Sequence, residues 1–192
     1  MSSLITPDTI SSDNVHKLLS DTNLSASSFV QSVFTSVFHS SFEASAVSLE
    51  ESQFVLDELF SPDCEVRRDH ELQDLIELKE ELIGRKAAAR SSNVKFEQII
   101  STNDDRPDEP AVVAGVIVVT RYMPFLIRAS PAQRLTHLYF SAKLEPLYGE
   151  LGGSNRRRFT SFYYTLVDKV PPIRFAMPHH PWEDEEDPEK VY

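Results

Sequence analysis

The chain has 192 residues, of which 41% are hydrophobic and 26% are charged, a composition typical of one ordinary globular domain. Thirty acidic residues against nineteen basic ones give a formal net charge of -11. Because this charge repels nucleic-acid phosphate and anionic lipid unless basic residues gather locally, neither nucleic acid nor a membrane is expected as a partner.

Helical periodicity dominates the first half of the chain. Residues 1 to about 22 are expected to form a flexible arm. Apolar residues at three- and four-residue spacing predict a helix from about Ser25 to Phe42, and a capping-box pattern at Ser48 predicts a second helix that ends before Pro62. A short strand over 64–68 and a third, amphipathic helix over 72–90 follow.

Strand patterns dominate the second half. Four apolar-rich segments with only turn residues between them predict strands over 94–101, 111–122, 134–144 and 158–170. Helices followed by consecutive strands indicate an α+β fold, in which helices pack in the concave face of a curved antiparallel sheet. This predicts a single domain over 23–170 and an extended acidic, proline-rich tail over 171–192.

The order of these elements resembles that of the NTF2-like superfamily, which includes the SnoaL-like and ketosteroid-isomerase-like proteins. The segment from Leu59 to Val66 is similar to that family's passage from its second helix into its first strand. The resemblance implies a cone-shaped α+β barrel with a pocket in its mouth, and often a homodimer formed through the outer sheet face. The family contains isomerases, dehydratases and cyclases as well as proteins that only bind or scaffold, so the fold does not fix the chemistry.

The resemblance to ketosteroid isomerase also implies a general base at the end of the first strand. Asp69 lies there, one residue later than the family pattern, and His70 follows it. A carboxylate and an imidazole at the cone mouth could transfer a proton to and from a substrate. Alternatively, Asp69 pairs with Arg67 or Arg68, or caps the helix that begins near Leu72.

Polar residues on the later strands are further candidates. Because side chains alternate along a strand, one of Tyr163 and Tyr164 must point into the cone, where a tyrosine could donate a hydrogen bond to an oxyanion. The same alternation places His137 on the outer face if Leu138 and its even-numbered neighbours face the helices. Arg121 could bind a substrate carboxylate, or simply emerge into solvent at the strand end.

Two functions follow from these residues. The first is an NTF2-like protein with a small apolar pocket that binds a hydrophobic small molecule, or performs cofactor-independent isomerase, dehydratase or cyclase chemistry on it. Asp69, His70 and Tyr163 are then the catalytic candidates, and Arg121, Tyr164 and His137 the substrate-binding ones. The second is a non-enzymatic interaction or scaffold protein that acts through a homodimeric sheet face or its acidic tail.

Three further expectations concern groups that the sequence lacks. No histidine pair has zinc-protease spacing, and Cys64 is the only cysteine, so neither a metal nor another cofactor is expected. A single cysteine cannot form an intramolecular disulfide, and the first residues lack the basic and apolar regions of a secretory signal. A cytoplasmic location is therefore expected.

Overall fold

A computed structural model describes residues 24–38, 49–106, 108–127, 130–147 and 156–171. The predicted arm over 1–22, nearly all of the predicted tail and the glycine-containing loop near Gly152 lie outside the described residues. No helix in the described ranges is long and apolar enough to cross a membrane.

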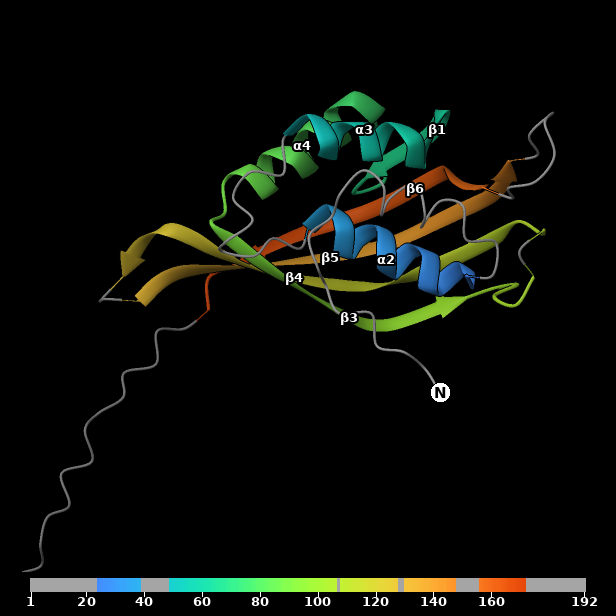
Figure 1. The fold of residues 1–192 in the computed structure, drawn as a ribbon. Helices are drawn as coiled ribbons and strands as arrows, with labels where there is room; N and C mark the ends of the chain where they lie inside the picture. Colours follow the sequence, from blue (N-terminus) through green and yellow to red (C-terminus); the bar gives the residue numbers. More distant parts are fainter. Residues whose placement is uncertain (1–23, 39–48, 107, 128–129, 148–155, 172–192) are drawn as a thin grey trace, which may run out of the picture.

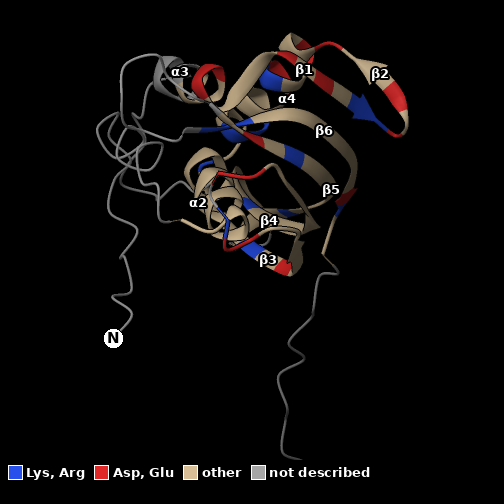
Figure 2. Ribbon diagram, turned by 90° about the vertical axis from the view of Figure 1, so that its right-hand side faces the viewer, with Lys and Arg blue, Asp and Glu red and all other residues tan. Residues whose placement is uncertain are grey.

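The described elements form a curved six-stranded sheet with helices on one face (Figure 1), and the curvature is seen from a second side in Figure 2. In chain order they are α2 (Ala26–Phe38), α3 (Leu49–Leu59), β1 (Phe60–Arg68), β2 (Glu71–Gln73), α4 (Leu75–Ala87), β3 (Ser91–Ser101), β4 (Ala111–Ile127), β5 (Ser130–Leu147) and β6 (Arg156–Lys169). The strand order is β2-β1-β6-β5-β4-β3, and only the β1–β6 pairing is parallel. The predicted α+β class is confirmed.

The helix α2 lies against the concave face because its apolar stripe is wide. Ser25 caps this helix, since its hydroxyl accepts a hydrogen bond of 3.2 Å from the Ser28 amide. The Asp104 carboxylate, from the β3–β4 connection, accepts two more hydrogen bonds, from the Ser27 amide at 2.8 Å and its hydroxyl at 3.0 Å. These contacts orient the buried side chains of α2 toward the sheet. They are Ala26, Phe29, Val30, Val33, Phe34, Val37 and Phe38.

Aromatic rings fill the space between α2 and the inner face of the sheet, the face toward the helices. The Phe162 ring on β6 is fully buried, and its centroid lies 5.4–6.1 Å from those of five other rings. The spacing is typical of favourable tilted and stacked aromatic pairs. We call this group the aromatic cluster: Phe34, Phe60, Phe140, Phe159, Phe162 and the ring of Tyr164.

The strands β3, β4 and β5 are longer than predicted, and two further regions differ in kind from the sequence expectation. The first strand begins at Phe60 rather than Cys64, so Pro62 lies within β1 instead of after a helix. Pro62 is tolerated there because the β1–β6 register shifts between Phe60 and Glu65 and requires no ladder hydrogen bond from the proline. The segment near Leu72, predicted as helix, instead forms the short strand β2, and α4 begins only after Asp74.

The edge strand β3 is bent by a bulge opposite a glycine. Gln98 has a positive φ of 51°, and the β3–β4 register shifts between Glu97 and Ile100. A Cβ atom on Gly115 would clash with the Ile99 side chain and lie 3.1 Å from the Gln98 carbonyl oxygen. Only glycine therefore allows the two backbones to approach closely enough at this point.

The strands β4 and β5 extend beyond their neighbours β3 and β6 in the sheet. On the β4 side, pairing with β3 extends only as far as Tyr122, which lies opposite Ser91. On the β5 side, pairing with β6 extends only as far as Leu135, which lies opposite Lys169. Beyond these pairs, residues 123–127 and 130–134 continue as a two-stranded ribbon, which projects past the body in Figure 1. We call this ribbon the arm.

Candidate functional site

The inner face of α4 carries two charged side chains beside its apolar anchors. The Asp74 carboxylate caps the helix by accepting a hydrogen bond of 2.8 Å from the Ile76 amide. With the helix beginning at this position, the side chains of Leu78 and Leu82 are buried in the core. Glu81 and Arg85 lie between this apolar side and solvent, form an i,i+4 ion pair of 2.9 Å, and are each only 17% exposed.

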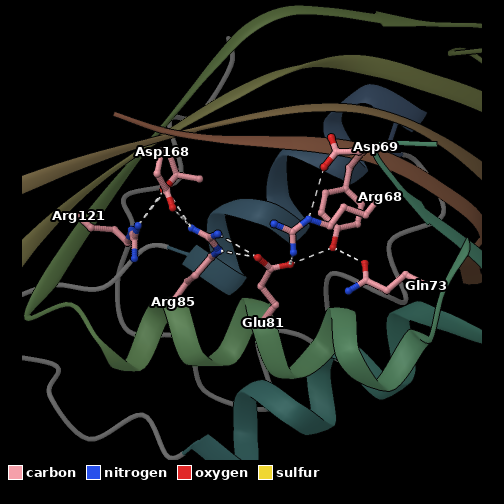
Figure 3. A network of polar contacts seen from close by, with 9 residues as sticks. Arg68, Asp69, Gln73, Glu81, Arg85, Arg121 and Asp168 are labelled. Carbon is pink, nitrogen blue, oxygen red and sulfur yellow. Dashed lines mark hydrogen bonds and ion pairs between the residues drawn. The ribbon is translucent and has the colours of Figure 1, made fainter. Parts of the chain in front are cut away.

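The Glu81 carboxylate is the centre of one half of the site (Figure 3). It accepts hydrogen bonds from Arg68 of β1 at 3.2 Å and from Arg85 at 2.9 and 3.2 Å. The Tyr164 hydroxyl on β6 lies 3.0 Å from the same carboxylate and 2.6 Å from the Gln73 amide oxygen. Its single proton can serve either acceptor.

The Asp168 carboxylate is the centre of the other half. It accepts a hydrogen bond of 2.6 Å from the Thr136 hydroxyl, two of 2.9 and 3.0 Å from Arg85, and one of 3.2 Å from Arg121. Arg85 thus links the two carboxylates (Figure 3). We call the whole set the polar network: Arg68, Gln73, Glu81, Arg85, Arg121, Thr136, Tyr164 and Asp168.

Burial and charge set the protonation states in the network. Burial alone would raise the pKa of Asp168, but hydrogen bonds from Thr136 and Arg85 and the nearby guanidinium charges lower it overall. Burial and the Glu81 carboxylate raise the pKa of Tyr164, so its hydroxyl keeps its proton. The network therefore holds cationic arginines around an ionised Asp168, with a neutral tyrosine as donor.

Arg121 is the most constrained cation of the network. Its side chain is 10% exposed, and its Nε atom is buried with no hydrogen-bond partner among the described residues. Burial lowers its pKa, although the Asp168 charge opposes this effect. The alternative in which Arg121 emerges into solvent is therefore wrong, because the strand places the residue on the inner face with Thr136.

Asp69 and His70 lie at the rim of this site, not inside it. They form the two-residue turn between β1 and β2, with positive φ values of 52° and 72°, as a type I′ hairpin requires. Both are exposed, and the Asp69 carboxylate lies 3.7 Å from the Arg68 Nε atom. The helix cap expected of Asp69 belongs instead to Asp74.

The remaining candidates divide between the two faces of the sheet. Tyr164 is the tyrosine that points inward, whereas Tyr163 is 40% exposed on the outer face, with the Arg67 guanidinium 5.8 Å from its ring centroid. His137 also lies on the outer face, half-buried and stacked on Tyr139 at 6.5 Å between ring centroids. The structure thus brings only Arg121 and Tyr164 of the six candidates into the polar network.

Glu81, Arg85 and Asp168 are not among the candidates that the sequence patterns indicate. One signal was present: Glu81 and Arg85 are four residues apart and flank Leu82, a buried position of the helix. Asp168 likewise continues the even-numbered inner row of Phe162 and Tyr164 on β6. Among the described residues, no group of three or more histidine, cysteine, aspartate or glutamate side chains is placed to hold a metal ion.

Comparison with known proteins identifies similar folds. No family model matches the chain, and no curated protein matches its sequence. A provisionally assigned scytalone dehydratase from Novosphingobium aromaticivorans is 12% identical, with 85% of this chain and 92% of that chain covered and a TM-score of 0.47. An NTF2-like protein of unknown function in nutrient uptake from Rhodospirillum rubrum is 9% identical, with 65% and 91% covered and a TM-score of 0.40.

A third similar structure is the CaMKII hub of S. rosetta, which is 10% identical, with 74% of this chain and 96% of that chain covered and a TM-score of 0.44. At these identities the likeness concerns the fold alone and says nothing of activity. The structure itself confirms the α+β architecture predicted from the order of elements, with helices on one face of a curved sheet.

Proposed function

We propose that this protein is a non-enzymatic interaction module that self-associates through the outer face of its sheet. The observation that carries the proposal is an apolar patch on that face. Side chains of three adjacent strands form it in cross-strand rows: Ala114, Val116 and Val118 of β4, His137, Tyr139 and Ser141 of β5, and Tyr163, Thr165 and Val167 of β6. We call this set the outer patch.

The outer patch combines exposed apolar surface with an electrically neutral rim. Tyr139, Tyr163 and Val167 are 45%, 40% and 37% exposed, although each lies within a strand that is paired on both sides. Ion pairs formed within single strands surround them: Lys95–Glu97 at 2.8 Å, Lys143–Glu145 at 2.6 Å and Arg67–Glu65 at 2.6 Å. Each pair cancels its own charge, so two copies can meet here although each chain carries -11.

A twofold axis suits such a surface. Self-complementary contacts need an apolar centre and a polar rim that does not repel its own copy, and both features are present. The interior of the domain supports the same proposal. The aromatic cluster fills one part of the concave side of the sheet, and the charged side chains of the polar network form ion pairs with one another.

Light scattering tests the proposal with one charge at the centre of the patch. At micromolar concentration the wild type is expected at twice the chain mass of 21.8 kDa, and Tyr139→Glu at one chain mass. The matched control is Ile76→Glu, which places the same charge on a residue that is 63% exposed on α4, a helix on the other face of the sheet. A wild-type mass of one chain, or a dimer that Tyr139→Glu leaves intact, would contradict self-association through this face.

A second candidate is small-molecule binding or proton-transfer chemistry in the polar network. The buried, unpartnered Nε of Arg121 favours it, because a bound carboxylate would satisfy that donor. Tyr164 would donate its retained proton to an oxyanion, with Glu81 as the nearby acceptor. Asp69 and His70, at the rim, would act only if the substrate reached the β1–β2 turn.

Thermal shift with a panel of hydrophobic carboxylic acids tests this second candidate. A ligand at about 100 times its dissociation constant would stabilise the wild type by roughly 2.7 kcal/mol. If the Tyr164 ring only packs in the core, Tyr164→Phe would keep most of this ligand-induced stabilisation. If the Tyr164 hydroxyl binds the ligand, the variant would lose it. An unchanged melting temperature across the panel would leave self-association as the function supported by the geometry.

A further inference from the structure

The arm exposes a continuous run of apolar side chains. Phe125, Leu126 and Ile127 are 52%, 62% and 42% exposed, and Pro124 before them is exposed as well. Between the pairs Tyr122–Gln133 and Leu126–Pro131, three residues of β4 face one residue of β5, so a bulge bends the ribbon here. Consecutive residues of a strand point to opposite sides, so both sides of the arm are apolar.

The hairpin that carries the arm is also the longest stretch of the chain without acids. From Ala111 to Leu144 there is no aspartate or glutamate, but there are four basic residues, in a chain with thirty acids. Two exposed cations, Arg134 and Lys169, lie at the root of the arm. Asp168, which precedes Lys169 in the sequence, already accepts hydrogen bonds from Arg85 and Arg121.

The arm also holds its apolar tip away from the acidic body. Ile127 lies five residues beyond Tyr122, the last residue of β4 that pairs with β3, and five residues of strand span roughly 17 Å. Fixed charges in physiological salt are screened over about 8 Å. The tip can therefore approach an anionic surface that the body as a whole would repel.

We infer that the arm is a docking element for an anionic lipid surface, with Phe125, Leu126 and Ile127 entering the interfacial layer and Arg134 and Lys169 contacting headgroup phosphate. Apolar side chains on both sides of a narrow ribbon suit a medium that surrounds it, whereas a folded protein partner would cover one side. Apolar insertion and basic contacts are the two signals that together give stable peripheral attachment. The inference does not depend on self-association through the outer patch.

Vesicle flotation of the full chain tests the inference. The probes are vesicles of phosphatidylcholine alone and of phosphatidylcholine with about 30% phosphatidylserine. The wild type is expected to float with the second kind and to be released as salt rises from about 0.1 M to about 0.5 M. Leu126→Asp and Arg134→Glu are each expected to weaken binding by about tenfold or more.

The matched control is Leu72→Asp, the same substitution at an exposed leucine of the β1–β2 hairpin, which should bind as the wild type does. Circular dichroism verifies that each variant is folded. Absence of wild-type binding to the anionic vesicles, or equal binding by Leu126→Asp and the wild type, would overturn the inference. A variant that lowers the light-scattering mass but not vesicle binding would instead make the arm a contact between subunits.

Discussion

The two faces of the sheet are built from the same strands but make opposite use of their side chains. On the inner face, Phe162 is fully buried among aromatic rings and Asp168 accepts hydrogen bonds from two arginines. On the outer face, Tyr139 and Val167 are more than one-third exposed, beside charges that pair within their own strands. Polar groups on the inner face hold the fold together, whereas those on the outer face leave apolar surface available.

The largest effect is expected in the aromatic cluster. Phe162→Ala removes a fully buried ring that contacts five others, and we expect it to lower the free energy of unfolding by about 3–5 kcal/mol. Urea unfolding followed by circular dichroism measures this change. A loss below about 1 kcal/mol would mean that this side of the sheet is not the close-packed core described above.

The polar network should contribute less, and in a pH-dependent way. Asp168→Asn weakens the contacts to Arg85 and Arg121, and we expect a loss of about 1–2 kcal/mol at neutral pH, because Asp168 is partly exposed. The folded-state pKa of Asp168 is lowered, so its contribution is complete above the unfolded value of about 3.9. This contribution is lost as the pH falls through the folded-state pKa.

Urea unfolding of the wild type and Asp168→Asn between neutral and acid pH measures this difference. It should shrink below about pH 4 and disappear once Asp168 is protonated in both states. Asp57→Asn is the control, because Asp57 forms an exposed ion pair of 2.7 Å with Lys79 and should contribute less than about 1 kcal/mol. A difference that stays constant across the acid range would contradict the ionised, stabilising role of Asp168.

The bulge of β3 gives an effect of similar size. A glycine of α4 provides a control in which the stability should change in the opposite direction. Gly115→Ala brings a methyl group against Ile99 and the Gln98 carbonyl, and we expect it to destabilise the protein by about 1–2 kcal/mol. Gly84→Ala, within α4, meets nothing within 4 Å and should stabilise by about 0.5–1 kcal/mol. Calorimetric melting of both variants measures the contrast, and the same sign for both would refute the close approach at Gly115.

The smallest effect on folding is expected on the outer face. Val167→Thr keeps the shape of a side chain that is 37% exposed, and should change the free energy of unfolding of the monomer by less than about 0.5 kcal/mol. It should nevertheless raise the dimer dissociation constant, because a hydroxyl replaces a methyl group in the outer patch. Sedimentation at several concentrations measures that constant, and an unchanged value would place Val167 outside the interface.

Much of the fold could be predicted because periodic patterns determine which residues become buried. The strand over 134–144 was identified from its alternation, and Leu138 and Phe140 are indeed buried, with His137 on the other face. The start of β1 was missed because a proline after helical residues usually ends a helix. Nothing local indicates that Phe60 pairs with Phe159, about a hundred residues later.

The site was less predictable because its members come from separate elements. Asp69 and His70 drew attention as an acid and a base side by side, but the same pair also fits a two-residue hairpin with positive φ values. Arg85 and Asp168 each look like an ordinary surface charge in their own segment. Only the packing of α4 on the sheet brings their atoms within 2.9 Å of each other.

The single parallel pairing in the sheet has a consequence for the order in which the molecule is made. The strand β1 has no partner on its sheet side until β6, which ends at Lys169, is available. During synthesis the helices α3 and α4 and the β1–β2 hairpin must therefore wait for almost the whole described chain to emerge before they can join the sheet. Such distant pairings slow folding. The last strand made, β6, joins β1 and β2 on one side to β5, β4 and β3 on the other.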